Sequence, residues 1–257
     1  MTTHDRRTDG DRRAELADAL VAVRARLTAA ALAAGRDPAE VTLIAVTKTC
    51  PASDVRLLAE LGVTDVGENR DQEAAPKAAA LAADPSVPTP RWHFIGQLQR
   101  NKCRSVVRYA DVVQSVDRVA LARALDAAAA AESAAAGRTA PRRLDVLVQV
   151  SLDGVAGRGG VLIDSTDSEH GFWPVVDAVT AQSHLRLAGL MAVAPLGQPP
   201  EPAFARLAEL SAQLIARVPQ ARVISAGMSG DLEAAVAAGA THVRVGSALL
   251  GNRPTLR

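Results

Sequence analysis

Apolar and polar positions along this chain alternate between two kinds of segment. Short runs rich in Val, Ile and Leu recur eight times, at 41–47, 63–67, 92–95, 111–116, 144–150, 185–193, 222–226 and 242–245. Longer alanine-rich stretches with helical spacing lie between them, at 52–61, 71–83, 118–136, 201–218 and 231–238. Short apolar runs bounded by turn residues predict buried strands, and longer periodic stretches predict helices.

A further amphipathic helix is expected before the first strand, over about residues 11–34. Its apolar face is formed by Leu16, Leu20, Val23 and Leu27. Gly35 and Pro38 follow and are expected to end it.

Strands that each precede a helix predict an α/β fold, a single-domain (β/α)8 TIM barrel with an extra N-terminal helix. A doubly wound open sheet is the alternative, but eight regular repeats in about 250 residues favour the barrel. No shift in composition marks a second domain, so one domain is expected over residues 1–257, with 1–11 as a flexible start. The segment Asp164–Gly171 lacks periodicity and is expected to be a surface insertion.

Composition excludes several classes of function. The net charge is +1 and aromatic residues make up 2% of the chain, which argues against binding nucleic acid by charge or by base stacking. No uninterrupted apolar run is long enough to span a membrane, and the polar start is not a secretory signal. Cys50 and Cys103 lack metal-ligand spacing and are interpreted as reduced thiols of a cytoplasmic protein.

Lys48 is the first candidate for chemistry. Only three of the 29 basic residues are lysines, and Lys48 comes directly after the apolar run 41–47. A desolvated lysine can lose its proton and attack a carbonyl, whereas arginine stays protonated. The alternative is a lysine that extends from a strand end with its amine in water. Position alone does not decide between them.

Strand parity indicates which side chains point into the barrel. Lys48 shares parity with Ile44 and Val46, so it lies over the interior if those two face inward. In the last strand, Val243 and Val245 suit the helix layer, which directs Arg244 into the barrel. A buried guanidinium must meet a carboxylate, a phosphate or another acceptor, and a structural ion pair and a ligand contact both stay open here.

Two glycine-containing turns follow the last two predicted strands. They are Gly227–Asp231 and Gly246-Ser247. Backbone N–H groups and serine hydroxyls at such turns can bind an anion, and the loops after the last two strands of a barrel commonly bind phosphate. The alternative is that Ser229 only caps a helix. Together with Lys48 and Arg244, the turns suggest a ligand that carries a phosphate and a carbonyl.

Several of these segments also form a series of motifs in order along the chain. They are Leu43–Thr49, Gly67–Glu73, Trp92–Lys102, Gly189–Val193, Gly227–Asp231 and Val243–Gly251. This series resembles the signatures of the pyridoxal phosphate homeostasis proteins from about residue 41 to 253. Val66, Arg70 and Arg158 depart from the family pattern, which has aromatics at the first two positions and commonly a lysine at the third.

The resemblance implies a barrel similar to the N-terminal domain of alanine racemase, with pyridoxal 5′-phosphate (PLP) as cofactor. Carried over residue by residue, it implies a Schiff base on Lys48 and a phosphate held by Ser229, Gly246 and Ser247, with the Met228 backbone adjacent. It also implies that Arg244 faces the pyridine nitrogen and that Asn69 lies beside the ring.

The residues also bear on whether the protein is a catalyst. An arginine beside the pyridine nitrogen disfavours its protonation, which weakens the ring as an electron sink. A racemase needs a second acid or base, which in related racemases is a tyrosine from a further domain. The only tyrosine here is Tyr109, expected in the helix after the third strand, and His93 and His242 are interpreted as hydrogen-bonded core residues.

We therefore expect a monomeric PLP carrier for intracellular PLP homeostasis, with no robust catalysis and with apo PLP-dependent enzymes as partners. A weak PLP-dependent racemase or lyase is the alternative. A cofactor-free aldolase that uses Lys48 is a third interpretation.

Overall fold

The computed structural model describes residues 9–137, 143–154 and 159–251. Its strands are β1 (Thr42–Val46), β2 (Asp65–Glu68), β3 (Arg91–Phe94), β4 (Val112–Val116), β5 (Leu144–Ser151), β6 (Val161–Leu162), β7 (Leu185–Ala192), β8 (Val223–Ser225) and β9 (His242–Val245). All eight strands expected from the apolar runs are confirmed, with their ends within two residues of the expected ones. The two-residue β6 was not expected.

The strands close into a barrel. Every pairing is parallel, in the order β4-β3-β2-β1-β9-β8-β7-β5, and β4 also pairs with β5 to complete the ring. β6 pairs with Val150 and Ser151, beyond the point where β4 ends. The barrel prediction is confirmed, and the open-sheet alternative is wrong because the first and last strands pair directly.

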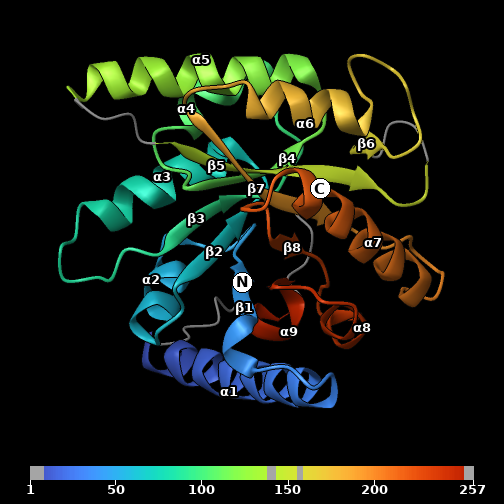
Figure 1. The fold of residues 1–257 in the computed structure, drawn as a ribbon. Coiled ribbons are helices and arrows are strands. Elements are labelled where there is room, and N and C mark those ends of the chain that lie inside the picture. The colour runs from blue at the N-terminus through green and yellow to red at the C-terminus, as the bar shows by residue number, and fades with distance from the viewer. Residues whose placement is uncertain (1–8, 138–142, 155–158, 252–257) are drawn as a thin grey trace, which may run out of the picture.

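Helices surround the barrel (Figure 1). The α-helices are α1 (Asp9–Ala33), α2 (Ala52–Glu60), α3 (Asp71–Ala82), α4 (Cys103–Val106), α5 (Val119–Ala135), α6 (Phe172–Thr180), α7 (Glu201–Arg217), α8 (Leu232–Ala237) and α9 (Ser247–Leu250). Two 3-10 turns, η1 (Pro38–Glu40) and η2 (Arg100–Lys102), lie in the connections.

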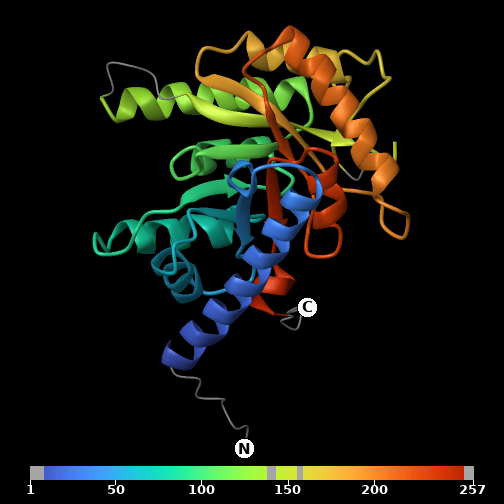
Figure 2. The ribbon, with the colours of Figure 1, turned by 60° about the horizontal axis from the view of Figure 1, so that its bottom comes forward.

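Helix α1 covers one side of the barrel (Figure 2). It begins at Asp9, two residues before the expected start, and its predicted apolar face is buried. That face packs against α2, α8 and α9. Ion pairs hold it at both ends, from Arg12 to Asp54 at 2.9 Å and from Arg26 to Glu233 at 2.8 Å.

Inward and outward positions alternate along the strands as predicted. Ala45, Val243 and Val245 pack with the apolar face of α1 in the outer layer. Ile44 and Val46 face the other way, since a Cβ placed on the inward side at Gly67 would lie 3.1 Å and 3.6 Å from their methyl groups. The barrel interior therefore receives the side chains that share parity with Lys48.

A β-bulge bends β7. Leu187 and Gly189 pair with consecutive residues of β5, so Ala188 is the extra residue. Gly189 has φ +155°, and a Cβ there would lie 1.9 Å from the Val223 carbonyl oxygen. Only glycine allows β7 and β8 to approach this closely.

The Asp164–Gly171 segment lies mostly on the surface, as expected, but it also has a structural role. The Val119 N–H donates to the Glu169 carbonyl oxygen at 3.0 Å, and the Ala120 N–H donates to the Glu169 carboxylate at 2.6 Å. Glu169 therefore caps the first turn of α5, which has no side-chain cap of its own.

Candidate functional site

Lys48 lies just past the carboxyl end of β1, in a tight turn. The Cys50 N–H donates to the Thr47 carbonyl oxygen at 3.0 Å, and Thr49 has φ +63°, an unusual value for a β-branched residue. Lys48 is exposed, and within the described residues its amine has no hydrogen bond or ion pair. The free amine can react with an incoming carbonyl compound.

The amines of the other two lysines have partners. The Lys77 amine is buried and lies 2.7 Å from Glu68 and 3.0 Å from the Thr47 carbonyl oxygen. The Lys102 amine lies 3.9 Å from Asp71. Lys48 is thus the one unpaired lysine of the three, all of which the structure describes.

Residues of β2 and α3 hold the turn that carries Lys48. The Thr47 hydroxyl donates to Glu68 at 2.6 Å, and the Thr49 N–H donates to Glu73 at 2.9 Å. Lys77 completes this arrangement through its bond to the Thr47 carbonyl oxygen. We call Glu68, Glu73 and Lys77 the clamp, because they fix the residues on both sides of Lys48.

Glu68 is the electrostatic centre of the clamp. Burial raises the pKa of Glu68, and the hydrogen bonds from Lys77 and Thr47 oppose this rise without cancelling it. Both of those bonds go to Oε1, and Oε2 is buried without a partner in the part of the chain that the structure describes. Charged Glu68 is therefore tolerated chiefly because Lys77 lies beside it.

Asn69 follows β2 next to the clamp. Its Oδ1 is buried and accepts no hydrogen bond from any described residue. The backbone of Gly96 approaches closely, since a Cβ there would lie 2.1 Å from the Asn69 carbonyl oxygen. A buried acceptor without a donor suits a ligand that brings one.

Arg244 points into the barrel, as parity predicted. It is 4% exposed, and burial lowers its pKa to about 10. Its guanidinium donates to the Ser225 hydroxyl at 2.7 Å and to the Ala192 carbonyl oxygen at 2.8 Å. No carboxylate of the described residues forms an ion pair with it, so the structural ion-pair interpretation is wrong.

The two turns after β8 and β9 meet each other. The Ala248 N–H, in the first turn of α9, donates to the Ser229 hydroxyl at 3.3 Å. The Met228 N–H donates to Asp231 at 2.6 Å, and no side chain of the described residues caps α8. Ser229 therefore joins the two turns instead of capping α8, and Gly246 and Ser247 lie on the adjoining turn.

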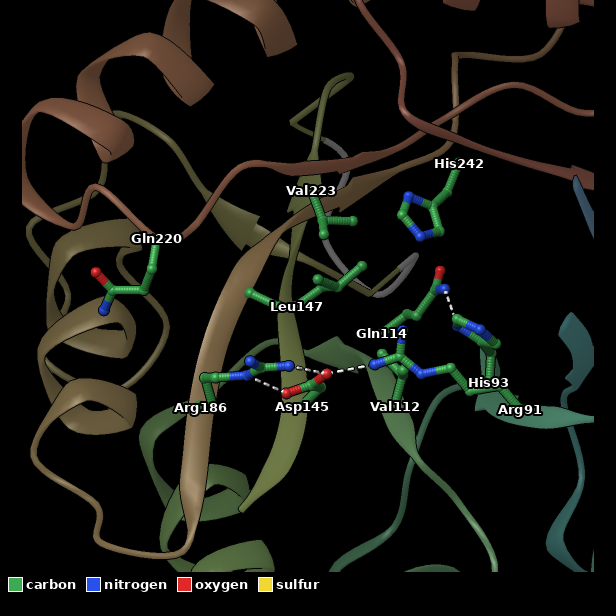
Figure 3. Close-up of a pocket in the computed structure, with 11 residues that line it drawn as sticks. Arg91, His93, Val112, Gln114, Asp145, Leu147, Arg186, Gln220, Val223 and His242 are labelled. Carbon is green, nitrogen blue, oxygen red and sulfur yellow. Dashed lines mark hydrogen bonds and ion pairs between the residues drawn. The ribbon is translucent and has the colours of Figure 1, made fainter. Parts of the chain in front are cut away.

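A cavity of about 180 Å³ lies at the opposite end of the barrel (Figure 3). It is lined by Arg91, His93, Val112, Gln114, Asp145, Leu147, Arg186, Ala188, Gln220, Val223 and His242. Most of these residues come from the amino-terminal halves of their strands, whereas Lys48 follows a carboxyl end. Asp145 binds Arg186 through two hydrogen bonds and also pairs with Arg91.

The two histidines lie at the end of the barrel away from Lys48, and the tyrosine lies beside Asp71. His93 and His242 line the cavity, and burial lowers the pKa of His242 to about 4. Tyr109 lies in the turn after α4, not within a helix. Burial also raises the pKa of the Tyr109 phenol, so the phenol stays protonated at neutral pH and cannot accept a proton.

The departures from the family pattern lie outside the barrel interior or outside the described residues. Val66 packs in the outer layer with α1 and α2. Arg70 is exposed and pairs with Glu73 at 3.4 Å. Arg158 is not among the described residues.

Metal and thiol chemistry receive no support from the described residues. They contain no group of three His, Cys, Asp or Glu side chains that could hold a metal ion. Cys50 and Cys103 are both buried and form no disulfide, and burial raises the pKa of Cys103 to about 11, which makes it unreactive. No helix in the described ranges is long and apolar enough to cross a membrane.

Comparison with known proteins agrees with this geometry. Residues 20–254 match the family described as alanine racemase, N-terminal domain. The pyridoxal phosphate homeostasis protein of Mycobacterium leprae is 45% identical over 251 residues, which cover 94% of each chain. The chain belongs to the pyridoxal phosphate homeostasis protein family.

Solved structures place the family within a known fold. PipY of Synechococcus elongatus, solved with PLP bound, has a TM-score of 0.74 and 33% identity, covering 92% of this chain and 100% of that one. Alanine racemase of Streptomyces coelicolor shares the fold, with a TM-score of 0.67 and 21% identity, and the match covers 94% of this chain but 59% of the racemase. The sequence-based family assignment is confirmed.

Proposed function

We propose that this protein binds PLP covalently through Lys48 and acts in PLP homeostasis as a carrier of the cofactor. The observation that carries the proposal is that Lys48 is exposed at the carboxyl end of the barrel and is the one unpaired lysine. PipY, which is similar over the whole of its length, was solved with PLP. When bound, PLP supplies an aldehyde that an amine can attack and a ring that can withdraw electrons.

The residues at this end of the barrel fit such a ligand. The Lys48 amine condenses with the aldehyde and releases one water. The turns that contain Met228, Ser229, Gly246 and Ser247 provide N–H and hydroxyl donors for a phosphate, because Ser229 holds the two turns together. Several convergent donors are needed to bind a dianion.

Arg244 and Asn69 contribute at the ring. Arg244 keeps N–H groups beyond those donated to Ser225 and Ala192, and it is proposed to face the pyridine nitrogen. A neighbouring positive charge disfavours a proton on that nitrogen. Asn69 offers a buried oxygen as acceptor to a ligand donor beside it.

Three features support carriage over catalysis. Arg244 weakens the ring as an electron sink. His93 and His242 lie at the other end of the barrel, and the Tyr109 phenol stays protonated because burial raises its pKa. Named relatives are homeostasis proteins. We further propose that the protein is a cytoplasmic monomer that passes PLP to apo-enzymes.

One experiment tests the covalent site. The purified protein is mixed with PLP, its visible absorbance is recorded, and the linkage is reduced with borohydride before peptide mapping. We expect a yellow protein with label at Lys48, a colourless but folded Lys48→Ala variant, and a yellow Lys102→Ala control. Label at Lys77 or Lys102 would overturn the assignment, and a colourless wild-type protein would favour the cofactor-free aldolase.

A second experiment separates the carrier from a weak racemase or lyase. The PLP-loaded protein is incubated with L- and D-alanine in deuterated water, and the α-proton is followed by NMR. We expect exchange no faster than with free PLP, together with transfer of PLP to an apo-enzyme. Faster exchange that is lost in Lys48→Ala would show catalysis instead.

A further inference from the structure

Five buried polar side chains form a continuous chain of hydrogen bonds through the barrel interior. Arg244 donates to Ser225 at 2.7 Å, and Ser225 donates to Gln114 Oε1 at 2.7 Å. Gln114 Nε2 lies 2.9 Å from His93 Nδ1, and His93 Nε2 lies 2.8 Å from Asp65. The chain crosses the interior between β8 and β4, which are not neighbours in the sheet.

The two ends of this chain fix the protons between them. A guanidinium can only donate, and an ionised carboxylate can only accept. Burial acts to raise the pKa of Asp65, but its hydrogen bonds with His93 and Thr64 lower the pKa overall, so Asp65 is ionised. Each group between Arg244 and Asp65 must therefore accept on one side and donate on the other.

The orientation of the Gln114 amide follows from this rule. Ser225 accepts from Arg244, so its own proton must go to Gln114 Oε1. The amide N–H of Gln114 then donates to His93 Nδ1, which leaves the imidazole proton on Nε2, facing Asp65. A flipped amide would leave the Ser225 hydroxyl proton buried without an acceptor, which is unfavourable.

We infer that Gln114 and His93 are positioning residues for Arg244, and that the chain holds His93 as the Nε2–H tautomer. This inference rests on the proposed role of Arg244 at the pyridine nitrogen. The chain joins a buried cation, which has no ion-pair partner among the described residues, to the buried Asp65 anion four hydrogen bonds away. It thereby orients Arg244 from the side away from Lys48.

The cavity beside the chain makes the inference testable by substitution. Gln114 and His93 both line it, and Figure 3 shows the hydrogen bond between them. A changed side chain at position 114 has room to adjust toward the cavity. The neighbouring Ser115 supplies a matched control, because it is as buried as Ser225 but its hydroxyl has no partner among the described residues.

The first measurement determines which ring nitrogen of His93 carries the proton. Long-range ¹H–¹⁵N NMR of the full chain, with and without PLP, should show His93 with its proton on Nε2. In Gln114→Glu the new carboxylate can only accept, so His93 Nδ1 should gain a proton. Protonation of wild-type His93 at Nδ1, or an unchanged tautomer in Gln114→Glu, would overturn the inferred order of donors and acceptors.

The second measurement tests the effect on Arg244. Ser225→Ala and Gln114→Leu should each weaken PLP binding about tenfold, the equivalent of about one hydrogen bond, whereas Ser115→Ala should not. Ser225→Thr, which keeps the hydroxyl, should restore binding. Equal affinities in Ser225→Ala and Ser115→Ala would overturn the positioning role while leaving the proposed function intact. Failure of the wild-type protein to bind PLP would overturn both, and the NMR result would still decide the proton positions.

Discussion

Replacing Lys77 tests how the clamp is stabilised. The Lys77 amine lies 2.7 Å from Glu68, and the two side chains are 9% and 0% exposed. Lys77→Met leaves Glu68 buried without its cation and should lower the free energy of unfolding by about 3–5 kcal/mol. Urea denaturation followed by circular dichroism measures this value. Lys102→Met is the control, since its partly exposed ion pair with Asp71 at 3.9 Å should contribute no more than about 1 kcal/mol.

The pH dependence of the same variant checks the cause. Burial already raises the pKa of Glu68, and loss of Lys77 raises it further. A carboxyl with a raised pKa binds more protons in the folded state, so its contribution to stability is larger at low pH and is lost as pH rises. The cost of Lys77→Met should therefore be smaller at about pH 5 than at about pH 7. Glu68→Gln/Lys77→Met should recover part of the loss. A cost below about 1 kcal/mol, or one independent of pH, would refute this account.

Three further predictions concern single positions. Gly246→Leu should weaken PLP binding, measured by titration, by about 1–3 kcal/mol. Gly246→Ala should still fold, because the added Cβ would lie 3.5 Å from Val46, an ordinary contact distance. Unchanged affinity in the leucine variant would place the phosphate elsewhere. Gly96→Ala should lower the free energy of unfolding by about 1–3 kcal/mol, because the added Cβ meets the Asn69 backbone. Gly230→Ala is the control, because an added Cβ there has no atom within 4 Å. Equal losses of stability in the two variants would contradict the close approach of Gly96 to Asn69. Burial lowers the pKa of His242 to about 4, so the folded protein resists protonation of His242 and loses up to about 3 kcal/mol of stability as pH falls below about 6.5. His242→Gln should therefore make the free energy of unfolding less dependent on pH over this range. An unchanged pH profile would argue against the shift.

The sequence predicted the strands better than some of the helices. Strands such as β1 were visible because a short apolar run is bounded by turn residues. Helix α6 was missed because Phe172–Thr180 is apolar on most sides, and a short apolar run has no helical period to detect. The two-residue β6 is too short to leave any pattern.

The sequence predicted those residues of the candidate site whose position depends on a single strand. Parity within the last strand was sufficient to place Arg244 inside the barrel, and the rarity of lysine together with the position after 41–47 made Lys48 a candidate. The clamp was missed, although Glu68 and Glu73 lie in a motif already noted and Lys77 is one of three lysines. Gln114 and Ser225 could not be paired from sequence, because their contact exists only once the barrel closes. The roles of the PLP-contacting residues stay predictions.

The packing of α1 has a consequence for how the chain folds. Thr42 of β1 pairs with His242 of β9, and the apolar face of α1 packs on α8 and α9. The first helix and first strand thus complete their packing only with α8, β9 and α9, which lie far along the chain. Contacts so distant in sequence slow folding, and until they form an apolar helix face and an unpaired strand edge remain open to other chains. The carboxyl-terminal strands therefore decide when a nascent chain becomes a stable barrel.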